Sequence, residues 1–145
     1  MSKKVIIISS IIGLIILAVA IYFTFFFYYS CTDASCFKSH QVKCAKTKFI
    51  NNEEATTWLY TIQGKQANLC DIEVKILQIK QGDLDRKTLE GKSMICSLDV
   101  GSISSPESDL SICHGRLKED IQEIMIKNTH SEILSNIGDS LKGLI

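Results

Sequence analysis

The segment TWLYTIQGKQANLCDIEVKI, residues 57–76, contains the clearest fold signal in this sequence. Residues 57–62 alternate aromatic and polar side chains, and residues 70–76 alternate apolar and charged ones. This period of two is typical of half-buried strands. The residues between the two runs include a glycine and an asparagine and predict a turn at 64–68. The two strands should therefore form a hairpin. The shift of apolar positions to Leu77 and Ile79 after Ile76 indicates either a β-bulge or a strand that is buried on both sides near its end.

The segments on both sides of this hairpin predict further elements. A third strand is expected over residues 94–100, where every second side chain is apolar. Before the hairpin, a helix is expected over residues 33–48, with Thr32 or Asp33 as its N-cap. After it, the Ser-Pro-Glu sequence at 105–107 is typical of a helix start. Gly115 and a capping-box pattern at 129–132 leave open whether the C-terminal region is one helix or two.

An uncharged run from Val5 to Tyr29 precedes these elements. Its 25 residues are enough for a helix to cross the roughly 30 Å hydrocarbon core of a bilayer. Lys3 and Lys4 lie before the run and few charges follow it, so the positive-inside rule predicts a cytoplasmic N-terminus. We therefore expect a cytoplasmic tail at 1–4, a transmembrane helix at 5–29 that serves as an uncleaved signal-anchor, and an extracytoplasmic domain at 30–145. Cleavage near Ala20, as in a signal peptide, is the alternative.

The expected fold class is α+β. An N-terminal transmembrane helix is followed by a helix, a three-stranded antiparallel meander and one or two C-terminal helices packed on the sheet. The chain of 145 residues has 16 basic and 16 acidic side chains, and 46% of its residues are hydrophobic. This composition excludes a disordered chain, and the balanced charge argues against a nucleic-acid partner. The expected localisation is the cell membrane, as a single-pass protein that contacts the lipid bilayer through residues 5–29.

All six cysteines lie after the apolar run, as an even number in a small domain predicted to be exported. This arrangement is typical of a disulfide framework. Six cysteines allow 15 connectivities, and the sequence does not choose among them. The preferred pairing closes only short or moderate loops and requires no threading: Cys31–Cys36, Cys44–Cys70 and Cys96–Cys113.

One local pattern has the residue types of a metal site. Cys36, His40 and Cys44 are spaced by four residues and would share one helical stripe. The spacing is not a standard zinc spacing, so we interpret both cysteines as disulfide partners and keep the metal site as the alternative. The sequence contains no C-x-x-C, no H-E-x-x-H, no G-x-S-x-G and no phosphate-binding glycine loop. We therefore predict no catalytic residues, no cofactor and no enzyme.

The C-terminal aliphatic stripe is the candidate surface for a partner. It could instead pack within the domain. Its members are Ile133, Leu134, Ile137 and Leu141.

The leading functional hypothesis is a membrane-anchored, extracytoplasmic domain that binds an envelope or surface protein or has a structural role in the envelope. One alternative is a thiol-redox or metal-handling protein that uses Cys31, Cys36, His40 and Cys44. Another is a minor pilin-like filament subunit, suggested by a long apolar helix before a small α+β head.

Several short motifs are spread over residues 31–127. They are Cys36-Phe37, Cys44, Trp58-Leu59-Tyr60, Leu89 to Met94 with Cys96, and Cys113-His114-Gly115 with Leu117-Lys118-Glu119. Together they resemble small, single-pass, cysteine-containing surface proteins of reduced-genome (DPANN-type) archaea. Those proteins have no assigned activity, so the resemblance implies an archaeal cell-surface domain and no particular mechanism.

Overall fold

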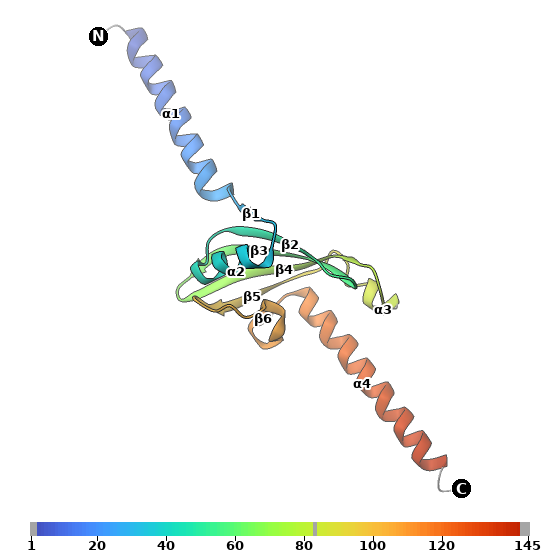
Figure 1. Cartoon of the computed structure of the whole chain (residues 1–145). Helices are drawn as coiled ribbons and strands as arrows, with labels where there is room; N and C mark the ends of the chain where they lie inside the picture. Colours follow the sequence, from blue (N-terminus) through green and yellow to red (C-terminus); the bar gives the residue numbers. More distant parts are fainter. Residues whose placement is uncertain (1–2, 83, 143–145) are drawn as a thin grey trace.

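The computed structural model describes residues 3–82 and 84–142, in which one sheet lies between two long helices that project in opposite directions (Figure 1). The strands follow one another across the sheet in chain order, from β1 at one edge to β6 at the other. The first two strands are parallel and the remaining neighbours are antiparallel. The elements are α1 (Lys3–Phe26), β1 (Tyr29–Cys31), α2 (Ala34–Lys43), β2 (Thr47–Asn52), β3 (Thr56–Gln66), β4 (Leu69–Ile79), α3 (Leu84–Lys87), β5 (Ser93–Asp99), β6 (Cys113–His114) and α4 (Arg116–Lys142).

The central strands β3, β4 and β5 are the three that the alternating pattern predicts. On β4 every second side chain from Cys70 to Ile76 is buried, as expected for one face on the core. The turn is tighter than expected and consists of Ala67 and Asn68, with Ala67 at φ +53°. Thr57 pairs with Gln78 and Trp58 with Ile76, so Leu77 is the extra residue of a bulge. Of the two interpretations of the shift after Ile76, the β-bulge is therefore the one confirmed.

The prediction of a three-stranded meander is wrong, because the sheet is mixed and has six strands. The helix predicted over 33–48 ends early, at Cys44, which adopts the left-handed conformation at φ +50°. The residues after it form β2, and Thr47 and Phe49 point their side chains into the core. The two edge strands, β1 and β6, have three and two residues. Runs this short show no recognisable periodicity in a sequence.

The C-terminal region also differs from the expectation. Pro106 starts a 3₁₀ turn, Pro106–Ser108, and a second such turn covers Leu110–Ile112. The long helix begins only at Arg116 and then runs without a break, so the capping-box pattern marks no helix start. Thr129 instead donates its hydroxyl to the carbonyl of Met125, one turn earlier. Only the beginning of α4 packs on the sheet, against β5 and β6, and the rest projects away from it (Figure 1).

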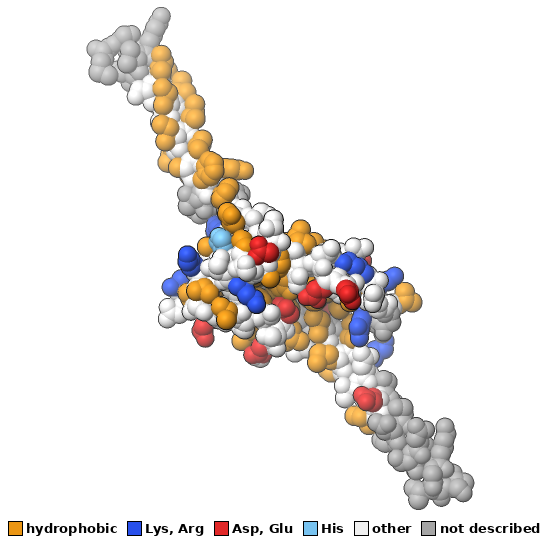
Figure 2. Space-filling view, in the orientation of Figure 1, with side chains coloured by type: hydrophobic (Ala, Val, Ile, Leu, Met, Phe, Trp, Pro, Cys, Tyr) orange, Lys and Arg blue, Asp and Glu red, His pale blue; other side chains and the backbone are white. Residues whose placement is uncertain are grey.

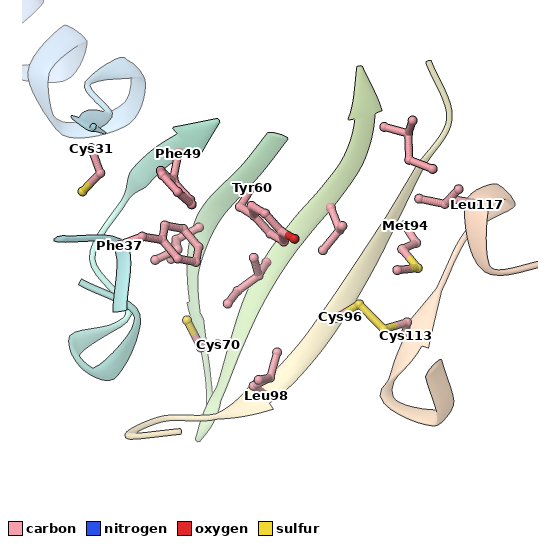
Figure 3. Packing of buried hydrophobic residues seen from close by; sticks show 14 of the residues in the cluster. Cys31, Phe37, Phe49, Tyr60, Cys70, Met94, Cys96, Leu98, Cys113 and Leu117 are labelled. Atoms are coloured by element: carbon pink, nitrogen blue, oxygen red, sulfur yellow. A yellow bond between two sulfur atoms is a disulfide. The ribbon is translucent and has the colours of Figure 1, made fainter. Parts of the chain in front are cut away.

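The core lies between the sheet, α2 and the start of α4 (Figure 3). Phe37 of α2 packs on Phe49 and Tyr60 of the neighbouring strands, with ring centroids 5.6 Å apart in both pairs. At the other end Met94 and Leu117 are almost fully buried and join α4 to β5. The isoleucines and valine of β4 fill the space between these two ends. Disulfides lie inside the same core, and Cys96–Cys113 is visible in Figure 3.

The N-terminal helix differs from the predicted transmembrane segment. Within the described residues, no helix has both the length and the apolar character needed to cross a membrane. The predicted transmembrane helix at 5–29 is therefore wrong. The predicted localisation in the cell membrane as a single-pass protein with a cytoplasmic N-terminus is wrong with it. The three disulfides are compatible with an extracellular location of the C-terminal domain.

Candidate functional sites

A cluster of two cysteines and one histidine lies where the chain passes from α1 into the sheet. Cys31 ends β1, Cys36 is in the first turn of α2, and His40 is one turn further along the same helix. The two cysteines form a disulfide that spans a sequence separation of 5 residues. The His40 Nδ1 atom is 3.9 Å from Cys31 Sγ and 4.0 Å from Cys36 Sγ. The ring of His40 also stacks on Tyr29, with centroids 4.8 Å apart.

The hydrogen bonds of His40 define which ring nitrogen carries the proton. Nδ1 is 3.0 Å from the carbonyl oxygen of Cys36. A carbonyl can only accept a hydrogen bond, so Nδ1 must donate and must carry the hydrogen. The hydrogen points at this carbonyl, and the Nδ1 atom also lies 3.9 Å and 4.0 Å from the two sulfur atoms of the disulfide. This arrangement can stabilise a negative charge that develops on either sulfur.

Asp33 organises the start of α2 beside this cluster. Its Oδ1 atom accepts hydrogen bonds from the backbone N–H of Cys36, at 2.8 Å, and from the hydroxyl of Ser35, at 2.7 Å. These bonds favour the charged form of the carboxylate and hold the pKa of Asp33 below its ordinary value. The N-cap predicted at Thr32 or Asp33 is thus Asp33. It fixes Cys36 in the first helical turn.

The alternative metal set is not assembled by the fold. Cys44 is disulfide-bonded to Cys70 and lies at the other end of α2 from Cys36. The atoms that do come together belong to Cys31, Cys36 and His40, all within 4.8 Å of one another. Their two sulfurs are bonded to each other and the nearest histidine nitrogen carries a hydrogen, so this donor set does not fit a metal ion in the oxidised protein.

The two remaining disulfides tie the layers of the fold together. Cys44–Cys70 joins the end of α2 to β4, and Cys96–Cys113 joins β5 to β6. All three pairs in the structure are those of the preferred pairing, and no cysteine is free. Cys113 is buried and His114 beside it is exposed, at a short edge strand. Adjacent residues of a strand point to opposite faces, so this pair forms no nucleophile and base.

A shallow cavity of about 160 Å³ opens above the aromatic end of the core. Its wall includes Phe37, Tyr60 and Glu107. The hydroxyl of Tyr60 donates to Glu107 Oε1 at 3.1 Å, while the other carboxylate oxygen is buried without a described partner. Burial, followed by the charge of Glu107, raises the pKa of Tyr60. The sequence contained no signal for this contact, because the two residues are 47 positions apart.

The candidate partner stripe lies on the projecting half of α4. Ile133 is 51% exposed, and nearby Met125 and Ile126 are exposed as well. Every side chain that the structure describes between residues 125 and 133 of this half is exposed. The side chains of Leu134, Ile137 and Leu141 lie outside those that the structure describes. A partner-binding role for this stripe stays a prediction, and Ile133 is the one member whose exposure the structure describes.

Comparisons with known proteins identify no relative. No protein-family model, no curated protein and no solved structure matches this chain. Nothing therefore points to an enzyme family, and the resemblance to archaeal surface proteins stays a prediction.

Proposed function

We propose that this protein is a non-enzymatic structural subunit of an oxidising compartment outside the cytoplasm, and that it assembles with other copies of itself through α1. The observation that carries the proposal is the surface of α1. This helix projects from the sheet as a rod of apolar side chains, while charged residues gather on the head (Figure 2). A helix that is apolar on nearly every side is stable only where other groups exclude water.

The extent of this surface argues for several neighbours around each helix. Large apolar side chains that are 47% to 64% exposed cover roughly three quarters of its circumference. Burying their exposed halves would contribute on the order of 10 kcal/mol or more. A single partner helix covers only one side, so we expect a bundle. The side chains are Ile7, Ile8, Ile11, Ile12, Leu14, Ile15, Ile16, Leu17, Val19, Ile21, Tyr22 and Phe23.

The remaining quarter of the helix surface favours protein neighbours. Ser9, Gly13 and Ala20 fall within about 40° of one another on the helical wheel. Small side chains let two helix axes approach closely. A Cβ atom added at Gly13 would meet nothing within 4 Å inside this chain. Contacts within the described chain therefore do not require glycine there, which supports a neighbouring helix packed against this side.

The three disulfides support the assignment to an oxidising compartment. Six buried or partly buried cysteines paired in this way persist in oxidising surroundings and are rare in the cytosol. An apolar N-terminal helix before a disulfide-bonded α+β head is also the arrangement that motivated the pilin-like alternative. A structural subunit of the envelope and a pilin-like filament subunit would both assemble through this helix, and that shared property is what we propose.

Photocrosslinking on the full chain tests this proposal. A photoreactive amino acid replaces Leu17, which borders the small-residue side, and the crosslinked product is identified by mass spectrometry. The expected product joins α1 of one copy to α1 of another. Gly13→Leu should reduce this product at least fivefold. The matched control, Ala18→Leu, introduces the same side chain on the other side of the helix and should reduce it less.

Three outcomes would contradict the proposal. They are a product that contains only lipid, a product that contains only a different protein, and equal effects of Gly13→Leu and Ala18→Leu. Circular dichroism of each variant confirms that the head is folded, so a loss of crosslinking reports on assembly.

A further inference from the structure

We propose that the Cys31–Cys36 disulfide is a thiol-exchange site, in which an external thiolate attacks Cys36 and His40 stabilises the departing Cys31. The co-reactant is a low-molecular-weight thiol of the glutathione or cysteine class. This inference concerns the head of the molecule. It does not depend on how α1 assembles.

Access to solvent selects the sulfur that is attacked. Five of the six cysteines are between 0% and 7% exposed, and Cys36 is the one that is more exposed than this. Thiol–disulfide exchange requires the incoming thiolate to reach a sulfur directly. The other two disulfides have both halves buried in the core. Cys36 is therefore where a mixed disulfide would form.

The exchange balances with two molecules of thiol. In the first step the external sulfur bonds to Cys36 Sγ, the Cys31–Cys36 bond breaks, and Cys31 leaves as a thiolate. In the second step another external thiolate attacks the external sulfur of the mixed disulfide and releases Cys36 as a thiolate. The two small thiols are oxidised to their disulfide and give up two protons, and the protein disulfide is reduced to two thiols. The reverse sequence closes the bond again.

The leaving group lies beside a hydrogen-bond donor. His40 Nδ1 carries its hydrogen, because it donates to the Cys36 carbonyl, and it is 3.9 Å from Cys31 Sγ. The stacked ring of Tyr29 limits how far the imidazole can turn. As charge accumulates on Cys31, rotation of the imidazole within its own plane can redirect this N–H from the carbonyl to the sulfur. Hydrogen bonds to charged groups are stronger than those between neutral ones.

The fold around the bond can survive its opening. β1 stays paired with β2, and the N–H of Tyr29 donates to the carbonyl of Lys46 at 3.0 Å. Phe37, next to Cys36, stays packed on Phe49 and Tyr60. These contacts do not involve the disulfide, so the two thiols remain close enough to close again. The bond can therefore cycle without unfolding the head.

Mapping of free thiols in the full-length protein tests the site. The protein is equilibrated in glutathione buffers of increasing reducing strength, quenched with N-ethylmaleimide and analysed by intact mass and peptide mapping. We expect two labels to appear first, on Cys31 and Cys36, while the other four cysteines stay paired and near-UV circular dichroism is unchanged. In Cys31→Ser, one glutathione should be found on Cys36. Opening of another pair first, or of all three together with loss of the folded spectrum, would overturn the proposal.

Variants of His40 test its role as a positioning donor. His40→Ala should slow reduction of Cys31–Cys36 about tenfold, the effect of losing one hydrogen bond to a charged group. His40→Asn keeps an N–H donor near the same place and should recover part of the rate. The control is His130→Ala, on the exposed part of α4. Equal reduction rates in wild type and His40→Ala, at equal melting temperatures, would remove His40 from the mechanism.

Discussion

Gly115 lies between β6 and α4 and has two reasons to be glycine. Its φ of +122° is outside the range that other residues adopt readily, and a Cβ there would be 3.2 Å from the Met94 Cα and the Ser93 oxygen. We expect Gly115→Ala to destabilise the protein by about 2 kcal/mol or more. Urea unfolding followed by tryptophan fluorescence measures this change. Gly101→Ala is the control: its φ of +98° is also positive, but its Cβ would meet no atom within 4 Å, so it should cost less than Gly115→Ala.

Tyr60 should make stability depend on alkaline pH. Burial and the charge of Glu107 raise its pKa above the ordinary value of 10.0. Between that value and the higher native one, the unfolded chain releases the phenolic proton and the native chain keeps it. Stability from this source is thus complete below pH 10 and falls as the pH rises above it. Urea midpoints measured between pH 8 and pH 11 should fall less steeply in Tyr60→Phe than in the wild type. Tyr22→Phe, on the exposed helix α1, should behave like the wild type.

The three disulfides should contribute unequally to stability. In the loop-entropy model, the pairs with sequence separations of 26 and 17 contribute about 3 to 4 kcal/mol each, and the pair with a separation of 5 contributes about 2 kcal/mol. Replacing both cysteines of each pair by alanine should therefore lower the melting temperature least for Cys31–Cys36. Differential scanning calorimetry of the three double variants gives the order. A larger loss for Cys31–Cys36 than for Cys44–Cys70 would contradict it.

Helix α4 has a buried beginning and an exposed continuation, and the two halves should respond differently to mutation. Leu117 is fully buried against β5, whereas Ile126 is 70% exposed. We expect Leu117→Ala to cost about 2 to 5 kcal/mol and Ile126→Ala to cost less than about 0.5 kcal/mol. Thermal unfolding of the two variants makes the comparison. A large effect of Ile126→Ala in the isolated chain would show that this half of α4 packs on the protein after all.

The strands were predictable where burial alternates over several residues and unpredictable where it does not. In β4, the alternation of apolar and charged residues identifies the side chains that face the core, which are Cys70, Ile72 and Val74. The turn from α2 into β2 depends on the left-handed conformation of Cys44. Cysteine adopts this conformation rarely, and no neighbouring residue in the sequence predicts it. The prediction of a helix that begins at Pro106 is wrong for a similar reason. The backbone at Gly115 has to approach β5, and that contact between distant segments overrides the local helix signal.

Part of the cysteine cluster could be read from spacing and part could not. Cys36 and His40 are four residues apart and therefore share a helix face, as predicted. The partner of that face is Cys31, because β1 pairs in parallel with β2 and so brings its last residue beside α2. The preferred pairing had already joined Cys31 to Cys36 and Cys44 to Cys70, and only the alternative metal set placed Cys44 with Cys36 and His40. The apolar surface of α1 was evident from the sequence, whereas its surroundings depend on other molecules that a single chain does not specify.

The order of the strands has a mechanical consequence. Because α1 precedes one edge strand and α4 follows the other, a pull on the two helices loads the sheet from edge to edge. The disulfides Cys44–Cys70 and Cys96–Cys113 close two loops that a pulling force cannot extend. These loops contain β2, β3 and the segment between β5 and β6. The largest stretch that can be drawn out is residues 71–95, at most roughly 80–90 Å when fully extended. The head is therefore a tether of limited length between whatever its two helices hold.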